Sequence, residues 1–189
     1  MAEWTIMMLS KWERDLFFQV WRGLLSFVNE RYGIDPSFGY PKKAGAVNSR
    51  RTVFQLRNKL WENDSIIDDY IQETKLYSAH KNILYRWKKR IDKRFVIIKY
   101  FRKYALLGDE DNNLYRVLGI SNPIEECFEN GETPPIIAHT SLLPFNNKII
   151  YDSFLKIENA DVEEKFKIIY EKNKDTEVNE ESIITRIKV

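Results

Sequence analysis

The spacing of apolar side chains changes near residue 94, and this change constrains the fold more than any other feature of the sequence. Before residue 94, apolar residues recur every three or four positions, as they do along one face of an α-helix. After it, short β-branched and aromatic runs alternate with turn-forming residues, a pattern typical of β-strands. A helical half followed by a strand half predicts an α+β fold.

Helical spacing before residue 94 falls into four segments. The first covers about residues 4–31, the next two contain Val53–Leu60 and Ile66–Ile71, and the fourth begins near Ser78. Charged residues lie mostly between the apolar ones, so each segment predicts an amphipathic helix. We expect the apolar faces to pack against the rest of the fold.

An antiparallel sheet of about four strands is expected after residue 94, followed by a C-terminal helix. A short helix is expected between the second and third strands, because Asn122, Pro123 and Glu125 form a typical helix start. The C-terminal helix carries Val162, Phe166 and Ile169 at helical spacing. The predicted strands cover Phe95–Leu107, Leu114–Ile120, Ile136–Leu143 and Lys148–Ile157.

Asn146 and Asn147 predict a tight hairpin turn between the last two strands, because asparagine tolerates positive backbone φ angles. A two-residue turn there pairs Ser141 with Asp152 and His139 with Phe154. His139, Ser141 and Asp152 then share one face of the sheet, which we expect to be a partly polar outer surface.

We expect a single domain over residues 1–189, since a chain of this length can build one sizeable core. Its helical part covers about residues 1–93, its sheet part about 94–158, and its C-terminal helix and tail about 159–189. The linker at Asp92–Arg94 is too short to separate independent domains.

Targeting and membrane signals are weak. Lys11 and Glu13 interrupt the apolar N-terminus before a signal-peptide core forms, and no apolar run reaches the ~18–20 residues of a spanning helix. The single cysteine, Cys127, excludes an internal disulfide and fits a reducing compartment. We therefore expect a cytoplasmic protein that does not associate with membranes.

Charge is sharply segregated along the chain. From Lys81 to Lys103 there are ten Lys or Arg and one acidic residue, Asp92, interleaved with aromatic residues. After Lys103 there are 17 Asp or Glu against nine Lys or Arg. The cationic segment either attracts a polyanion or is neutralised by the acidic C-terminal half.

The leading functional expectation is a binding or regulatory protein that holds a nucleic-acid backbone at this helix–strand junction. The alternative is that the cations form a solvated face paired with the protein's own carboxylates. A second alternative is a protein-interaction or oligomerisation module, to which the aromatic first helix would contribute Trp12 and Trp21. The residues expected to bind nucleic acid are Arg86, Lys88, Lys89, Arg90, Lys93 and Arg94.

Catalysis has no local signature in this sequence, and an enzyme without a recognisable motif is the third class left open. His139, Ser141 and Asp152 are the residue types of a nucleophile, base and orienting acid, but they lack a strained nucleophile turn and an oxyanion loop. The spacings of zinc sites, calcium loops and phosphate-binding loops are absent. We expect no catalytic residues, no metal and no cofactor.

One segment, Leu142–Asp152, resembles a recurring segment of a family of uncharacterised bacterial proteins, roughly LLPF-x-x-K-I-I-Y-D-G. Trp87–Ile91 and Tyr115–Glu125 are similar to the parts that precede it in that family. Ser153 stands where the family usually has glycine, and this chain lacks the cysteine-rich motif of some relatives. The resemblance implies a shared fold over about residues 80–157 and implies no activity.

Overall fold

The computed structural model describes residues 8–39, 49–128, 132–158, 162–175 and 183–188. The chain divides into two compact units, one formed by residues 1–14 and 89–189 and the other by residues 15–88. We refer to them as the barrel unit and the helical unit. The expected single domain remains a prediction, and each unit is described separately below.

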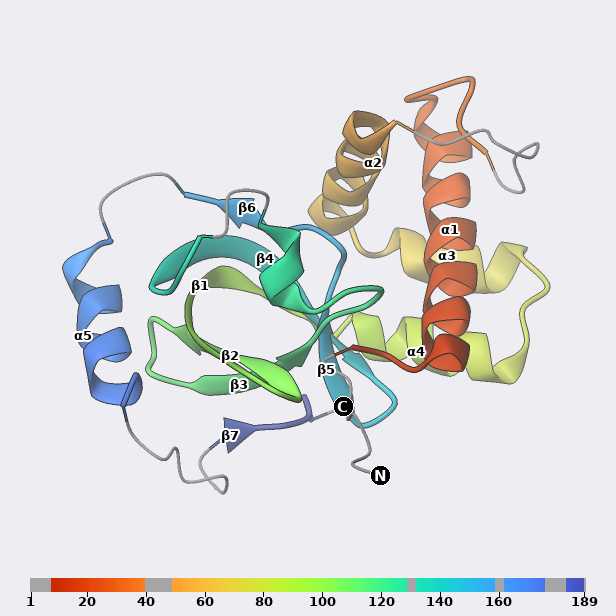
Figure 1. Cartoon of the computed structure of the whole chain (residues 1–189). Coiled ribbons are helices and arrows are strands. Elements are labelled where there is room, and N and C mark those ends of the chain that lie inside the picture. Colours follow the sequence, from red (N-terminus) through yellow and green to blue (C-terminus); the bar gives the residue numbers. More distant parts are fainter. Residues whose placement is uncertain (1–7, 40–48, 129–131, 159–161, 176–182, 189) are drawn as a thin grey trace. The chain divides into compact units, whose positions relative to one another are not determined.

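Four helices lie before the sheet, in the order expected from the sequence (Figure 1). The first begins later than predicted, because the carboxylate of Glu13 and the backbone and hydroxyl of Ser10 bond reciprocally and cap the helix. All of this helix except its first four residues belongs to the helical unit, together with the other three helices. The bounds are α1 Lys11–Tyr32, α2 Arg50–Glu62, α3 Ile66–Glu73 and α4 Ser78–Trp87.

Aromatic side chains form the core of the helical unit. Trp21 of α1 lies between three other rings, with centroids 5.9 Å from Phe17, 5.8 Å from Trp61 and 5.7 Å from Trp87. All four are at least nine-tenths buried, and rings of this size contribute most of a small core's buried apolar area. The apolar faces predicted for these helices are therefore the internal core of this unit.

The barrel unit contains, in the described residues, a seven-stranded mixed sheet that is mostly antiparallel, followed by a C-terminal helix. The α+β class is thus confirmed. The strands are β1 Ile91–Phe101, β2 Tyr104–Asp109, β3 Leu114–Leu118, β4 Ile136–Phe145, β5 Lys148–Tyr151, β6 Lys156–Ile157 and β7 Ile183–Ile184, with a 3₁₀ turn η1 at Ile124–Cys127 and helix α5 at Glu164–Asn173.

Five of these strands close into a ring. The order is β1-β2-β3-β5-β4, and β4 pairs back onto the N-terminal half of β1. All pairs in the ring are antiparallel except β3 with β5. In Figure 1 these strands curl around one another. The ring is a small closed barrel, which removes the open edges that a flat sheet would leave.

Strand alternation divides the barrel residues into two faces. Phe95, Ile97, Leu107 and Tyr115 share the inner face, where the Phe95 and Tyr115 rings meet edge to face at 5.6 Å. The outer face of β1, β2 and β3 is covered by α5 and β7. Its buried cluster consists of Val96, Ile98, Tyr104, Leu106, Leu114 and Ile137 with Phe166, Ile169 and Ile183.

The structure adds a hairpin that the sequence pattern did not predict. The expected strand Phe95–Leu107 is two strands, joined by a turn at Arg102 and Lys103. Neither turn residue has a positive φ angle and neither is Gly, Pro or Asn, so the usual turn signals are missing. The predicted strand Lys148–Ile157 likewise divides into β5 and β6, and part of the predicted apolar tail pairs with β3 as β7.

The predicted register of the β4–β5 hairpin is confirmed. Phe145 pairs with Lys148, and the series continues until the Asp152 amide donates to the Ser141 carbonyl at 3.0 Å. The predicted pairing of His139 with Phe154 is wrong, because the register shifts after Asp152 and His139 pairs with Lys156 of β6. Asn146 and Asn147 have φ angles of 47° and 60°, as a tight primed turn requires.

Gly108 of β2 sets how closely α5 approaches the barrel. A Cβ at this position would lie 2.7 Å from Cγ2 of Ile169 and 3.1 Å from Cδ1 of Ile98. We expect Gly108→Ala to lower the free energy of unfolding by about 1–3 kcal/mol through overpacking. Ile169→Ala removes the contacting methyl and leaves a cavity, so this single substitution should lower the free energy of unfolding by about 2–5 kcal/mol.

The double variant should lose less than the sum of the two single losses, because the methyl added in one occupies space vacated by the other. Urea unfolding of the four proteins measures this coupling. Strict additivity would contradict the packing of α5 against β2 that we describe.

Ser153 adopts a left-handed backbone with φ of 70°, where a side chain is unfavourable. We expect Ser153→Gly to raise the free energy of unfolding by up to ~1 kcal/mol, since strain relief exceeds the entropy that glycine loses. Lys156→Gly, in nearby strand β6, is the control and should lower it by ~0.5–1 kcal/mol. If Ser153→Gly and Lys156→Gly lower the free energy of unfolding equally, as measured by thermal or chemical unfolding, Ser153 is unstrained.

Candidate nucleic-acid interface

The six cations expected to bind nucleic acid are spread over three kinds of element. Arg86 lies on α4 and Lys88 caps its C-terminal end. Lys89 and Arg90 form the connection to β1, and the last two belong to β1 itself. The division between the two compact units passes between Lys88 and Lys89. Arg86 and Lys88 therefore belong to the helical unit, and the other four belong to the barrel unit.

Three of the six already pair with the protein's own carboxylates. The ammonium of Lys88 lies 2.5 Å from Asp68. Lys93 lies 2.5 Å from Asp111 and 3.2 Å from the buried Asp109. These pairs are the alternative that the sequence left open, in which the acidic residues neutralise the cationic segment.

Arg94 has the most extensive pairing. Its guanidinium donates to Glu158 at 2.6 Å and to Glu163, and it lies 3.6 Å from Glu110. The hydrogen bonds to Glu163 and Glu158 raise the pKa of Arg94 above its ordinary value. The same guanidinium lies over the Phe166 ring at 5.2 Å, so Arg94 fastens α5 to β1. A residue bound in this way is a poor ligand for phosphate.

Adjacent residues of β1 point to opposite faces, which explains why Lys93 and Arg94 have different partners. Lys93 shares the face of Phe95 and reaches Asp109 of β2, whereas Arg94 shares the face covered by α5. By contrast, Arg86 and Lys89 are exposed and form no ion pair with a carboxylate of the described residues.

Asp109 is fully buried and organises the turn between β2 and β3. It accepts hydrogen bonds from the Asn113 backbone at 3.0 Å, from the Tyr115 hydroxyl at 2.9 Å and from Lys93. Burial alone would raise the pKa of this carboxyl, but the hydrogen bonds outweigh burial and hold the pKa below its usual value. The acidic cluster at Asp109–Asp111 is therefore a structural turn.

Four other cations lie around the β1–β2 turn and are not paired in this way. Arg102 and Lys103 form the turn and are exposed. Lys99 of β1 lies over the Phe101 ring at 5.4 Å, and Arg116 of β3 lies over the Tyr104 ring at 4.3 Å. None of the four forms an ion pair with a carboxylate in the described part of the chain.

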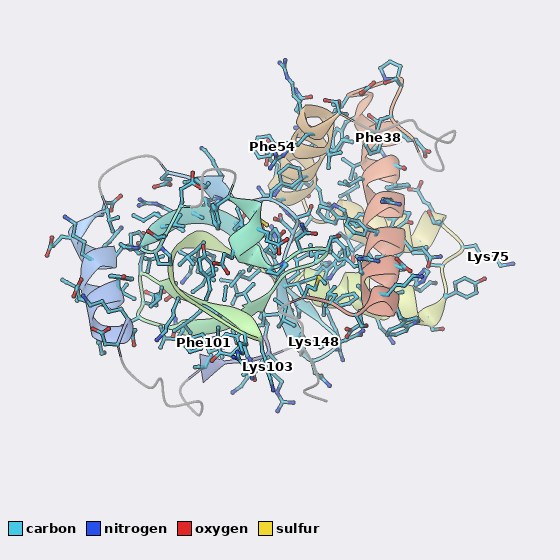
Figure 2. The ribbon with its side chains drawn as sticks, in the orientation of Figure 1. Phe38, Phe54, Lys75, Phe101, Lys103 and Lys148 are labelled. Atoms are coloured by element: carbon cyan, nitrogen blue, oxygen red, sulfur yellow. The ribbon has the colours of Figure 1, made fainter. Side chains whose placement is uncertain are left out.

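The rings of this region join the four cations into one surface. Phe101 and Tyr104 pair across the hairpin and stack, with centroids 4.7 Å apart and planes at 26°. Tyr104 is buried, whereas Phe101 is partly exposed. Figure 2 labels Phe101 and Lys103 close together at the turn. We call Lys99, Phe101, Arg102, Lys103 and Arg116 the turn cluster.

Sequence analysis did not select the turn cluster, although three of its cations lie in the segment Lys81–Lys103. The signal that points to it is the sequence Phe101-Arg102-Lys103-Tyr104, two cations between two rings. The sequence pattern predicted one continuous strand through these four residues. Only the hairpin of β1 and β2 places them at an exposed turn. Arg116 lies on β3, and only pairing of β2 with β3 brings it close.

The hairpin face of His139, Ser141 and Asp152 is less exposed than expected. Ser141 and Asp152 have no exposed surface, so the expectation of an outer polar face is wrong for these two residues. The Thr140 hydroxyl donates to the Phe154 carbonyl at 2.6 Å and lies 3.5 Å from Asp152. Nε2 of His139 lies 3.4 Å from Asp92. The polar groups here support the end of the hairpin.

The two tryptophans considered for protein association differ in their surroundings. Trp21 belongs to the core of the helical unit and is 2% exposed, whereas Trp12 is 67% exposed. Of the two, only Trp12 offers its ring to a partner.

Other site types are not found in the described residues. No three His, Cys, Asp or Glu side chains there come together as metal ligands do. None of the helices in that part of the chain is both long enough and apolar enough to cross a membrane.

Comparison of the chain with protein-family models, with curated proteins and with solved structures finds no match in any of the three. The resemblance of Leu142–Asp152 to an uncharacterised bacterial family therefore remains a prediction.

The lowered pKa of Asp109 predicts a pH dependence of stability. A carboxyl whose pKa is lower in the folded than in the unfolded state stabilises the fold above the unfolded pKa. That contribution is lost as the pH falls through the folded pKa. We expect Asp109→Asn to lower the free energy of unfolding at pH 7 by about 1–3 kcal/mol. Between pH 6 and pH 3, the free energy of unfolding of this variant should fall less than that of the unsubstituted protein.

Asp111→Asn is the matched control, because Asp111 binds the same Lys93 but is exposed. Its effect at pH 7 should stay within ~0.5 kcal/mol. Chemical unfolding at several pH values measures both variants. Identical acid sensitivity of Asp109→Asn and the unsubstituted protein would refute the assigned role of Asp109.

Proposed function

We propose that this protein binds single-stranded nucleic acid at the turn cluster of its barrel unit. The observation that carries the proposal is the arrangement around the β1–β2 turn. Lys99 lies over the partly exposed Phe101 ring, Arg102 and Lys103 follow that ring in the turn, and Arg116 lies over the Tyr104 ring, which stacks on Phe101. None of these four cations forms an ion pair with a carboxylate of the described residues. Cations for phosphates and a ring for bases are the two components of single-strand binding sites.

The proposal moves the binding surface away from the helix–strand junction expected from the sequence. A cation already held by a carboxylate must give up that partner before it binds phosphate, which offsets the gain. Lys88, Lys93 and Arg94 have such partners. The turn cluster has none among the described residues, so its cations can release phosphate counterions at no such cost.

A single strand is favoured over a duplex because of Phe101. Its ring is backed by Tyr104 and by the apolar cluster under α5, so it is held in a fixed orientation while part of it stays exposed. Stacking a base on such a ring contributes about 1–3 kcal/mol. The bases of a duplex are stacked on one another and cannot use it.

Strand order also supports the proposal. The ring β1-β2-β3-β5-β4-β1, with β3 and β5 parallel, has the connectivity of the OB-fold, a Greek-key barrel that often binds oligonucleotides at its second and third strands and at the β1–β2 and β4–β5 loops. Here α5 covers much of that face. Lys148, beside the β4–β5 turn, lies 2.5 Å from Glu13. Of the positions at which that fold binds oligonucleotides, the β1–β2 turn is therefore the one that we assign to binding here.

Fold alone does not establish a function, and the substitutions below test the site itself. We expect Arg102→Glu with Lys103→Glu to weaken binding of an oligo-dT strand by tenfold or more at low salt. The slope of log affinity against log salt should fall by about 1.4, which corresponds to two lost phosphate contacts on a single strand. Fluorescence anisotropy over a salt series measures both quantities.

The control is Lys156→Glu with Lys167→Glu, which changes the net charge equally at exposed positions of the same unit. It should alter the affinity no more than about twofold. Phe101→Leu, which keeps apolar packing, should weaken single-strand binding without changing the salt slope. Equal effects of the turn and control pairs, or no binding by the unsubstituted protein, would refute the proposal.

The protein-interaction alternative keeps one specific observation, the exposed ring of Trp12. It predicts a mass above the monomer that falls after Trp12→Ala and is unchanged by substitution of the turn cluster.

A further inference from the structure

The helical unit has an exposed surface of its own that is both cationic and aromatic. From Thr74 to Lys88 the sequence has four Lys or Arg and no Asp or Glu. Two tyrosines in this stretch are unusually exposed, Tyr77 at 76% and Tyr85 at 50%. Large rings that a folded helix leaves in solvent among cations offer contact area to a partner.

Helix α4 places these side chains in two adjacent rows. Tyr77, Lys81 and Tyr85 follow one another at intervals of four residues, which brings side chains onto the same face of a helix. The first turn closes as the Lys81 amide donates to the Tyr77 carbonyl at 3.1 Å, so Tyr77 begins this row although it precedes the helix. The adjacent row is exposed along its whole length and consists of Ser78, Asn82 and Arg86.

The buried side of α4 holds this surface in place. Ile83, Leu84 and Trp87 are buried there, and Trp87 belongs to the aromatic core of the unit. A helix anchored in this way loses less conformational entropy when a partner binds. Lys75 precedes the helix and is exposed, and Figure 2 shows its side chain extending away from the helices. We call Lys75, Tyr77, Lys81, Tyr85 and Arg86 the α4 surface.

The cations of the α4 surface are not matched by the protein's own acidic side chains. None of the three forms an ion pair with a carboxylate in the described part of the chain. By contrast, Lys88 at the end of α4 lies 2.5 Å from Asp68, and the exposed Arg31 lies 2.6 Å from Glu73. Charge complementarity therefore favours an occupant that carries negative charge.

The two rings favour a protein occupant over a nucleic acid. An exposed ion pair contributes only about 0–1 kcal/mol, so three cations give little affinity unless the rings are also buried. Tyrosine and arginine are among the residue types that dominate binding energy at protein interfaces. The outer side of a single helix is also convex, and it lacks the cationic groove that follows the backbone of a single strand.

We propose that the α4 surface binds an acidic segment of another protein. Apolar side chains of that segment pack on the two tyrosine rings, and its carboxylates pair with Lys75, Lys81 and Arg86. Eight residues of helix separate the tyrosines by about 12 Å along the axis, so the segment must offer apolar groups about that far apart. All five residues of the α4 surface belong to the helical unit, so this site is independent of the function proposed for the turn cluster.

The test begins with random peptides displayed on phage and selected on the full-length protein. Peptides of about 12 residues are long enough to reach both rings, whether helical or extended. The strongest binders should carry a net negative charge together with apolar side chains. A synthetic copy of the strongest binder should bind at least tenfold more tightly than a counterpart in which Asn and Gln replace its Asp and Glu. Its affinity should fall as salt is added, because salt screens exposed charges.

Variants then locate the binding site of the selected peptide. Tyr77→Ala with Tyr85→Ala should weaken binding by tenfold or more, since both rings lose their contact area. Lys75→Glu with Arg86→Glu should weaken it by tenfold or more through charge repulsion. Fluorescence anisotropy of the labelled peptide measures each affinity.

Arg31→Glu with Lys59→Glu is the matched control for charge, because both residues are exposed cations of the same unit. It should leave binding of the selected peptide within about twofold of the unsubstituted protein. Thermal unfolding of every variant verifies that these surface changes preserve the fold.

Oligo-dT and phosphatidylserine vesicles are the competing probes. The tyrosine and charge variants of the α4 surface should bind oligo-dT within about twofold of the unsubstituted protein, because the turn cluster is unchanged in them. If these variants weaken binding of oligo-dT or of the vesicles as strongly as binding of the peptide, the surface fits a phosphate-bearing ligand and the inference fails. If no selected acidic peptide depends on the α4 surface, the inference is refuted and the proposed function stands.

Discussion

Pairing of β4 with the N-terminal half of β1 is the interaction on which the barrel unit depends. β1 is the longest strand and pairs with β4 over Ile91–Ile97 and with β2 over Phe95–Phe101. This double pairing closes the ring. It also places the second half of β1 and the start of β2 in a hairpin that continues to the turn at Arg102 and Lys103. The proposed binding site is the end of that hairpin.

Closure also determines how the charges of the unit are divided. In β1, Lys93 and Arg94 lie where the ring meets the β2–β3 turn and α5, and both are used to fasten these parts. At the other end of the same strand, Lys99 and the two turn residues lie beyond the carboxylates that hold Lys93 and Arg94. Strand β1 thus begins with cations that are held by carboxylates, and it ends, together with the turn, in cations that form no ion pair with a carboxylate of the described residues. The distinction comes from position in the barrel, because the residue types are the same.

Prediction from the sequence succeeded where a local signal was strong. Asn146 and Asn147 predicted both the turn and the register of β4 with β5, since few residues tolerate positive φ angles. It failed at Arg102 and Lys103, whose turn has none of the usual residues and interrupts a continuous apolar run. The turn cluster was not selected from the sequence for the same reason. Without the hairpin, nothing distinguished Lys103 from Lys93, and the pairing of Lys93 with Asp109 depends on strand contacts that a linear sequence does not contain.

The sequence by itself determined the α+β class, the helical segments, the β4–β5 hairpin and the presence of a strongly cationic segment. These follow from periodicity, turn residues and composition, which are local properties. Only the tertiary structure decided that the strands close into a ring, that α5 covers its outer face, and which cations pair with carboxylates of the described residues. Those outcomes depend on contacts between residues far apart in the chain, where Arg94 meets Glu158 and Arg116 meets Tyr104. A charge is available to a ligand only if folding has not already brought an opposite charge beside it.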